Sequence, residues 1–108
     1  DHLLALYDGG VAWVDSEVGR FLDGLEALGL SEETLVIVTA DHGEEFFEHG
    51  RKTHRKQLHA ESVRVPLVMR WPGRLPAGAR ISGPTGIVDV APTILRAAGL
   101  RAPEASPS

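Results

Sequence analysis

The sequence predicts an α/β domain in which a mixed, mainly parallel sheet is flanked by helices. Residues 35–38 form an apolar, mostly β-branched run typical of a strand covered on both faces, and amphipathic helical patterns lie before and after it. Two helices and two strands are too few to cover both faces of such a sheet. We therefore expect residues 1–100 to be part of a larger domain, and residues 101–108, with two prolines and two serines, to be a tail or linker.

The first helix is predicted from about residue 3 to residue 28, because apolar residues recur there at spacings of three and four. Gly29 is a natural stop. Gly9 and Gly10 lie inside the pattern, and each costs a helix about 1 kcal/mol. Either the helix begins after them with Asp8 as its cap, or another group packs closely against them.

Two strands follow the first helix. The first is the apolar run ending at Thr39, and the second is predicted over residues 64–71, where Pro66 belongs at the beginning or edge because it lacks a backbone donor. Between them, residues 44–61 are polar and weakly periodic. We expect this segment to be a loop, or a short helix and loop, over the strand ends.

A second helix is predicted near the end of the chain, after a loop rich in proline and glycine at residues 74–85. We expect it to begin around Asp89, whose carboxylate can cap it, with Pro92 in the first turn. Gly99 is the expected end of this helix.

The strongest functional signal follows the first strand, where Asp41, His42 and Gly43 stand in succession. Open parallel sheets bind ligands just beyond the carboxyl ends of their strands. A carboxylate and an imidazole suit a divalent cation, Ca²⁺, Mn²⁺ or Zn²⁺, and Gly43 would let the backbone turn away beneath the ion. We predict that Asp41 and His42 are metal ligands, although two ligands alone do not complete a site.

A basic cluster lies further along the same loop, with four cations and His54 among residues 51–56. Beside a metal, such a cluster could hold the oxygens of a sulfate or phosphate ester. The alternative is a solvated surface loop of mixed charge, in which the acidic residues Glu44, Glu45 and Glu48 balance the basic ones. His49 and His59 are expected to be structural or exposed.

Composition narrows the classes of function. The formal net charge of −4 argues against a nucleic-acid-binding protein, and no apolar run is long enough to span a bilayer. The chain of 108 residues contains no cysteine, so disulfides are excluded.

Several motifs occur in an order and spacing that resemble the sulfatase family of the alkaline phosphatase superfamily. They are residues 39–44 (Thr-Ala-Asp-His-Gly-Glu), residues 48–50 (Glu-His-Gly), His54, residues 61–67 (Glu-Ser-Val-Arg-Val-Pro-Leu), residues 70–73 (Arg-Trp-Pro-Gly) and residues 88–95 (Val-Asp-Val-Ala-Pro-Thr-Ile-Leu). The joint occurrence of these motifs makes the resemblance specific, and it covers about residues 3 to 100. It implies an alkaline-phosphatase-like sandwich and a metal-dependent hydrolase of sulfate esters.

The resemblance also implies roles for single residues. Asp41 and His42 are similar to the second pair of metal ligands in sulfatases, for which Ca²⁺ is the expected ion. His54 is similar to the histidine or lysine that contacts the charged group of the ester or helps to hold a metal. Lys52, Arg55 and Lys56 have the chemistry for the same contact, and the family pattern does not single out one of them. The predicted catalytic residues are His54, Lys52 and Lys56. The substrate implied is a small-molecule sulfate ester or a sulfated sugar.

One element of the family is missing. Sulfatases attack sulfur with a formylglycine made from a cysteine or serine in a short motif with proline and arginine. Residues 82–84 (Ser-Gly-Pro) lack the arginine and come too late in the chain. We therefore expect the N-terminal half of the catalytic domain to precede Asp1 and the isolated piece to be inactive. A phosphodiesterase or phosphonate monoester hydrolase of the same superfamily, and a non-catalytic fragment, are the alternatives.

Overall fold

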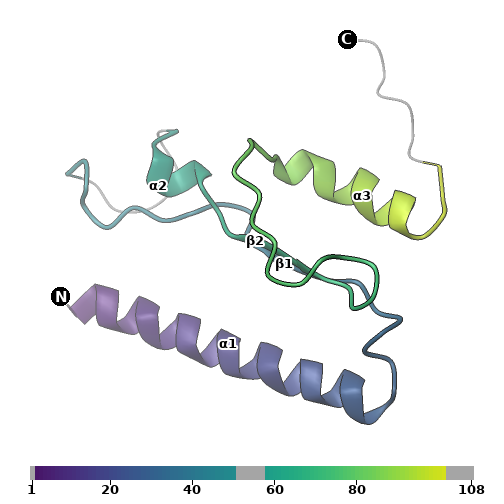
Figure 1. Ribbon diagram of the computed structural model, residues 1–108. Helices are drawn as coiled ribbons and strands as arrows, with labels where there is room; N and C mark the ends of the chain where they lie inside the picture. The colour runs from purple at the N-terminus through teal and green to yellow at the C-terminus, as the bar shows by residue number, and fades with distance from the viewer. Residues whose placement is uncertain (1, 51–57, 102–108) are drawn as a thin grey trace. The chain divides into compact units, whose positions relative to one another are not determined.

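The computed structural model describes residues 2–50 and 58–101 (Figure 1). The described elements are α1 (His2–Ala27), β1 (Val36–Thr39), α2 (Ala60–Val63), β2 (Leu67–Arg70), the 3-10 helix η1 (Ile87–Asp89) and α3 (Val90–Ala97). The predicted order of helix, strand, strand and helix is confirmed. The chain divides into two compact units, Asp1–Gly78 and Ala79–Ser108.

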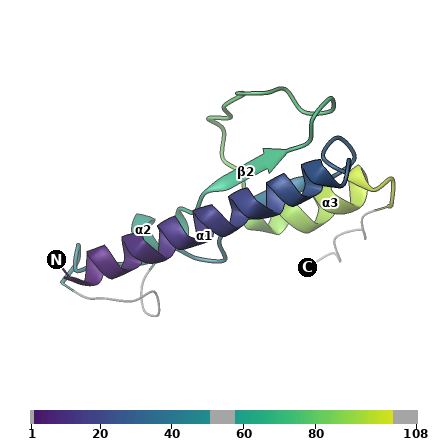
Figure 2. The same cartoon turned by 90° about the horizontal axis from the view of Figure 1, so that it is seen from below.

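Helix α1 runs without interruption through Gly9 and Gly10, so the alternative start with Asp8 as cap is wrong (Figure 2). The other expectation, close packing against these glycines, is not met in the described residues either, because a Cβ at Gly9 or Gly10 would meet nothing within 4 Å. It ends as predicted at Gly29, which has a φ of 70°. The Gly29 N–H donates to Glu26 O at 2.9 Å and the Leu30 N–H donates to Leu25 O at 2.9 Å, the paired bonds of a Schellman motif. Among the described residues, no helix is both long enough and apolar enough to cross a membrane.

Strands β1 and β2 form a two-stranded antiparallel sheet, in which Val36 pairs with Arg70 and Thr39 pairs with Leu67. The predicted sheet was mainly parallel, and in the described part of the chain the one strand pair is antiparallel. The connection between the strands, residues 40–66, is long enough for either arrangement, so its length does not decide the direction of pairing. Pro66 immediately precedes the first paired residue of β2, as its missing donor requires.

The expectation that β1 is covered on both faces is not met in the described residues. Val36 and Ile37 are half-buried, whereas Val38 and Thr39 are exposed. Within residues 2–50 and 58–101, no hydrophobic residue is fully buried. A two-stranded sheet has an open edge on each strand and leaves apolar side chains uncovered, so these elements do not enclose a core of their own.

The second unit contains η1 and α3. The prediction that the Asp89 carboxylate caps the helix is wrong: Asp89 has helical backbone angles at the end of η1, and its side chain makes no capping hydrogen bond. The chain thus enters α3 from an existing helical turn. Pro92 lies in the first turn and Gly99, with a φ of 73°, follows the helix end, both as predicted. Most of the predicted tail, residues 102–108, lies outside the described residues.

Candidate metal-binding site

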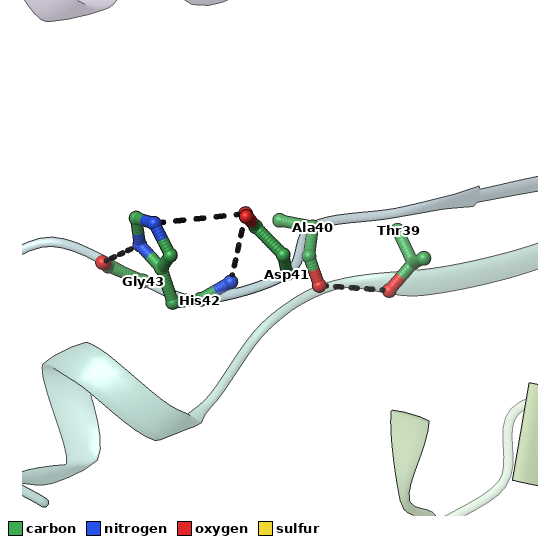
Figure 3. A network of polar contacts seen from close by, with 5 residues as sticks. All are labelled: Thr39, Ala40, Asp41, His42 and Gly43. Carbon is green, nitrogen blue, oxygen red and sulfur yellow. Dashed lines mark hydrogen bonds and ion pairs between the residues drawn. The ribbon is translucent and has the colours of Figure 1, made fainter. Parts of the chain in front are cut away.

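Asp41 and His42 lie just beyond the carboxyl end of β1, separated from the strand by Ala40 alone (Figure 3). The side chain of Asp41 folds back onto its neighbour, and its Oδ1 accepts a hydrogen bond from the His42 backbone N–H at 3.0 Å. The position predicted for the pair, at the end of a strand, is confirmed. Their role as metal ligands stays a prediction.

The imidazole of His42 is held by the backbone that follows it. Its Nδ1 lies 2.9 Å from the carbonyl oxygen of Gly43. Because a carbonyl oxygen only accepts, Nδ1 carries the proton in this hydrogen bond, and the neutral ring then has its lone pair on Nε2. A backbone carbonyl is a common partner for the second nitrogen of a metal-binding histidine, because it fixes both the tautomer and the ring orientation.

The two predicted ligand atoms are close enough to share one ion. His42 Nε2 lies 3.7 Å from Asp41 Oδ1. Oxygen and nitrogen ligands lie roughly 2.0–2.6 Å from a bound divalent cation, so both atoms can reach the same ion. The donor set of one carboxylate and one imidazole therefore fits a divalent metal in chemistry and in spacing.

The pair is open on its outer side, since the Asp41 side chain is 89% exposed and that of His42 is 42% exposed. Open carboxylate and imidazole groups are accessible to an ion. A zinc ion takes about four ligands and a calcium ion about six to eight. Asp41 and His42 can therefore supply only part of such a coordination shell.

Gly43 serves the site in a different way from the one predicted. Its φ lies outside the left-handed region, so no special backbone angle requires glycine here. Instead its N–H donates to Ser62 O at 2.8 Å, and a Cβ at this position would overlap the carbonyl oxygen of Glu61. Glycine is needed because the segment after β1 lies directly against α2.

The acidic residues of the loop are not equivalent, contrary to a simple solvated loop of mixed charge. Glu45 is only 5% exposed, whereas Glu48 is exposed and accepts a hydrogen bond from the Phe46 N–H at 2.5 Å. The loop bends at Phe47, which has a left-handed φ of 71°, an uncommon conformation for a residue with a large side chain. In the same loop, the ring of Phe46 packs edge to face against the ring of Tyr7 in α1, with the ring centroids 4.9 Å apart.

A second group of potential ligands comprises Glu45, His49 and His59, which offer one donor atom each within 4.8 Å of one another. The two imidazole rings are stacked, with centroids 3.8 Å apart. His49 Nε2 also lies 3.3 Å from Glu61 Oε2. The pKa of the Glu61 carboxyl is lowered, first by a hydrogen bond from its own backbone and then by the hydrogen bond with His49.

Sequence reasoning missed this group. The sequence predicts that His49 and His59 are structural or exposed, and it gives Glu45 no role beyond balancing the basic residues. Glu45 and His49 stand four residues apart, but His59 comes ten residues later, so only the folded loop brings it to the others. The spacing of Glu45 and His49 was the one signal available.

The three predicted catalytic residues, Lys52, His54 and Lys56, lie outside the described residues. Their contact with a substrate stays a prediction from the sequence.

Comparison with known proteins decides the family. The family model described as Sulfatase matches residues 1–100 of this chain. The chain belongs to the sulfatase family. Since the match includes the segment from β1 to β2, the predicted resemblance is confirmed, and the Asp41–His42 pair lies within a sulfatase sequence.

Several named sulfatases are similar to this chain. Mouse steryl-sulfatase is 39% identical over 109 residues, covering 90% of this chain and 18% of its own length. Human arylsulfatase K is 35% identical over 103 residues, covering 95% of this chain and 19% of its own. The N-acetylglucosamine-6-O-sulfatase of Bacteroides thetaiotaomicron is 37% identical over 90 residues, covering 83% of this chain and 16% of its own length. This sulfatase-family chain thus spans about a fifth of the length of the curated relatives it matches.

A solved structure extends the similarity to the fold. BT4656 in complex with its substrate, D-glucosamine-2-N,6-O-disulfate, is similar with a TM-score of 0.79 and 37% identity, covering 87% of this chain and 19% of that one. The described helices and strands therefore have a counterpart within a larger protein.

Proposed function

We propose that this sulfatase-family chain is part of the catalytic domain of an enzyme that hydrolyses sulfate esters. The observation that carries the proposal is the placement of Asp41 and His42 at the end of β1, with ligand atoms 3.7 Å apart, inside a chain that matches the sulfatase family over residues 1–100. Its relatives include steryl-sulfatase, arylsulfatase K and N-acetylglucosamine-6-O-sulfatase. All three names describe the removal of sulfate.

In this proposal Asp41 and His42 hold one side of a divalent metal, with Ca²⁺ the preferred ion and Mn²⁺ or Zn²⁺ the alternatives. The ion would neutralise charge on the sulfate oxygens. The hydrogen bond from His42 Nδ1 to Gly43 O keeps the imidazole turned with Nε2 near the carboxylate of Asp41, so the chain presents both donors in advance.

The basic segment after Gly50 has the second proposed role. His54, Lys52 and Lys56 would contact the charged oxygens of the ester and stabilise the charge that develops on the leaving oxygen. The support is their residue type and the family match that includes these positions. Lys52 and Lys56 supply compact positive charge, and His54 supplies a group that can also donate a proton.

The nucleophile would come from another part of the protein. None of the 108 residues is a cysteine, and the Ser82-Gly83-Pro84 sequence lacks the arginine of the formylglycine motif. We place the nucleophile and the first pair of metal ligands in a segment that precedes Asp1. Further parallel strands from that segment would cover the open edges of β1 and β2 and complete an alkaline-phosphatase-like sandwich, with residues 1–100 as part of this domain and 101–108 as a tail or linker.

The proposed substrate is a small-molecule sulfate ester or a sulfated sugar. The sugar is favoured by the relative named an N-acetylglucosamine-6-O-sulfatase, and by the solved structure with a disulfated glucosamine that its description calls its substrate. The net charge of −4 gives no general attraction for a larger polyanion such as nucleic acid.

The proposal is tested on the full-length protein that contains this chain. Its hydrolysis of p-nitrophenyl sulfate and of bis-p-nitrophenyl phosphate would be compared, and the peptide carrying the nucleophile examined by mass spectrometry. We expect preference for the sulfate and a formylglycine in a Cys/Ser-x-Pro-x-Arg setting. Preference for the phosphate diester, with a threonine or an unmodified serine at that position, would place the protein in the phosphate-processing branch of the superfamily instead.

A further inference from the structure

A compact group of donors, separate in its residues from Asp41 and His42, lies in the loop after β1 and at the start of α2. Glu45 and His49 come from the loop, and His59 is the residue at the N-terminal cap of α2. One donor atom from each lies within 4.8 Å of the other two. We call this group the Glu45–His49–His59 cluster.

The burial of Glu45 is the observation that points to a ligand. Glu45 is only 5% exposed, and its Oε1 has no hydrogen-bond partner in the described part of the chain. A buried carboxylate oxygen without a partner loses its hydration and gains nothing in return. A cation in the cluster would supply the missing interaction, because buried charges in proteins are paired or coordinate metals.

The two histidines already contact each other. Their rings are stacked at a centroid distance of 3.8 Å and an interplanar angle of 18°, and one nitrogen of each ring lies within 4.8 Å of the other. Glu61 Oε2, at 3.3 Å from His49 Nε2, gives His49 the outer carboxylate that often orients a metal-binding imidazole.

We propose that the Glu45–His49–His59 cluster binds a Zn²⁺ ion. Two imidazoles and one carboxylate form a nitrogen-rich donor set that suits zinc better than calcium, and three protein ligands leave a fourth position for water. The donors lie within 4.8 Å of one another, against roughly 3–4 Å between ligands of one zinc ion, so binding requires the stacked imidazole rings to rotate until their in-plane lone pairs meet at the ion. Since His49 and His59 stand on either side of the basic segment in the sequence, the ion would fix its two ends relative to each other.

The test uses the full-length protein, stripped of metal by a chelator, in an Asp41→Ala background that removes the other metal-binding pair. Zinc affinity is measured by competition with a chromophoric chelator for Glu45→Gln and for Glu48→Gln. Both changes remove one negative charge from the same loop, but Glu48 is outside the cluster. We expect Glu45→Gln to weaken zinc binding by roughly tenfold or more and Glu48→Gln to change it less than about twofold.

Equal zinc affinity in the two variants, or the absence of zinc binding in their parent, would overturn the proposal. Should Glu45→Gln fail to fold, His59→Ala and Co²⁺ substitution replace it. Co²⁺ in the cluster should give the visible absorption of a tetrahedral nitrogen and oxygen site, and His59→Ala should abolish it. A Co²⁺ spectrum typical of octahedral coordination by water, unchanged by His59→Ala, would contradict the site.

Discussion

His42 Nε2 lies 3.7 Å from Asp41 Oδ1, while Nδ1 of the same ring is bonded to the carbonyl oxygen of Gly43. The hydrogen bond at Nδ1 thus fixes the orientation of the imidazole, and Nε2 lies beside the carboxylate of Asp41. Both groups follow directly from β1, so the strand end determines where this pair of donors stands.

Replacing Asp41 by Ala should weaken Ca²⁺ binding by roughly tenfold or more, because the ion loses one charged oxygen ligand. Isothermal titration calorimetry on the full-length protein measures the change. Asp15→Ala is the matched control: it removes the same charge from an exposed position on α1. An affinity equal to that of the control would remove Asp41 from the coordination shell.

Gly43→Ala should destabilise the full-length protein by about 1–3 kcal/mol, because the new methyl group overlaps Glu61 O and pushes the loop away from α2. The hydrogen bond from Gly43 N to Ser62 O would be strained by the same movement. The free energy of unfolding in urea reports the effect. Gly24→Ala is the control, since its Cβ meets nothing within 4 Å on α1, and it should stabilise the protein by about 0.5–1 kcal/mol. Equal effects at both glycines would show that the close approach is unimportant.

Glu61 should contribute to stability in a pH-dependent way. Its pKa is lowered from 4.5 in the folded chain, so the ionised carboxylate stabilises the folded state above that pH, and the contribution disappears as the pH falls through the lower folded-state pKa. The difference in free energy of unfolding between wild type and Glu61→Gln should therefore be present at neutral pH and shrink at pH values below 4.5. In a His49→Ala background this difference should be smaller at neutral pH. A difference that grows on acidification would contradict the assignment.

The isolated 108-residue chain should not hydrolyse p-nitrophenyl sulfate, because it has no cysteine and no serine in a Ser-x-Pro-x-Arg motif from which a formylglycine is made. Its described residues also enclose no hydrophobic core. The assay compares the purified chain with the full-length protein at equal concentration. Turnover by the chain alone, retained after repurification, would mean that a nucleophile for sulfate transfer lies among these residues.

The sequence predicts best what depends on neighbouring residues. Gly29 and Gly99 end their helices with φ values of 70° and 73°, and a glycine after an amphipathic pattern is a local signal. The apolar run that forms β1 directly precedes Asp41 and His42 in the sequence, so it predicts the position of this pair at the strand end. Asp89 shows the limit of such signals: its residue type favours a cap, yet the preceding turn η1 already supplies helical backbone there.

Features that depend on distant residues could not be predicted in the same way. The antiparallel pairing of β1 with β2 is set by the path of the chain between them, which the strand residues do not encode. The Glu45–His49–His59 cluster exists because residues ten positions apart meet when the loop folds back on α2. Burial of Glu45, the observation that distinguishes it from Glu48, is likewise a property of the folded loop.

Whether Asp41 helps to hold the metal of a sulfate-ester hydrolase is tested by returning Ca²⁺ to the metal-free full-length protein and measuring kcat/KM for p-nitrophenyl sulfate in the wild type and in Asp41→Ala. We expect kcat/KM to rise with Ca²⁺ in the wild type and to be lower by roughly a hundredfold or more in the variant. Equal activity of the two proteins would contradict this role of Asp41.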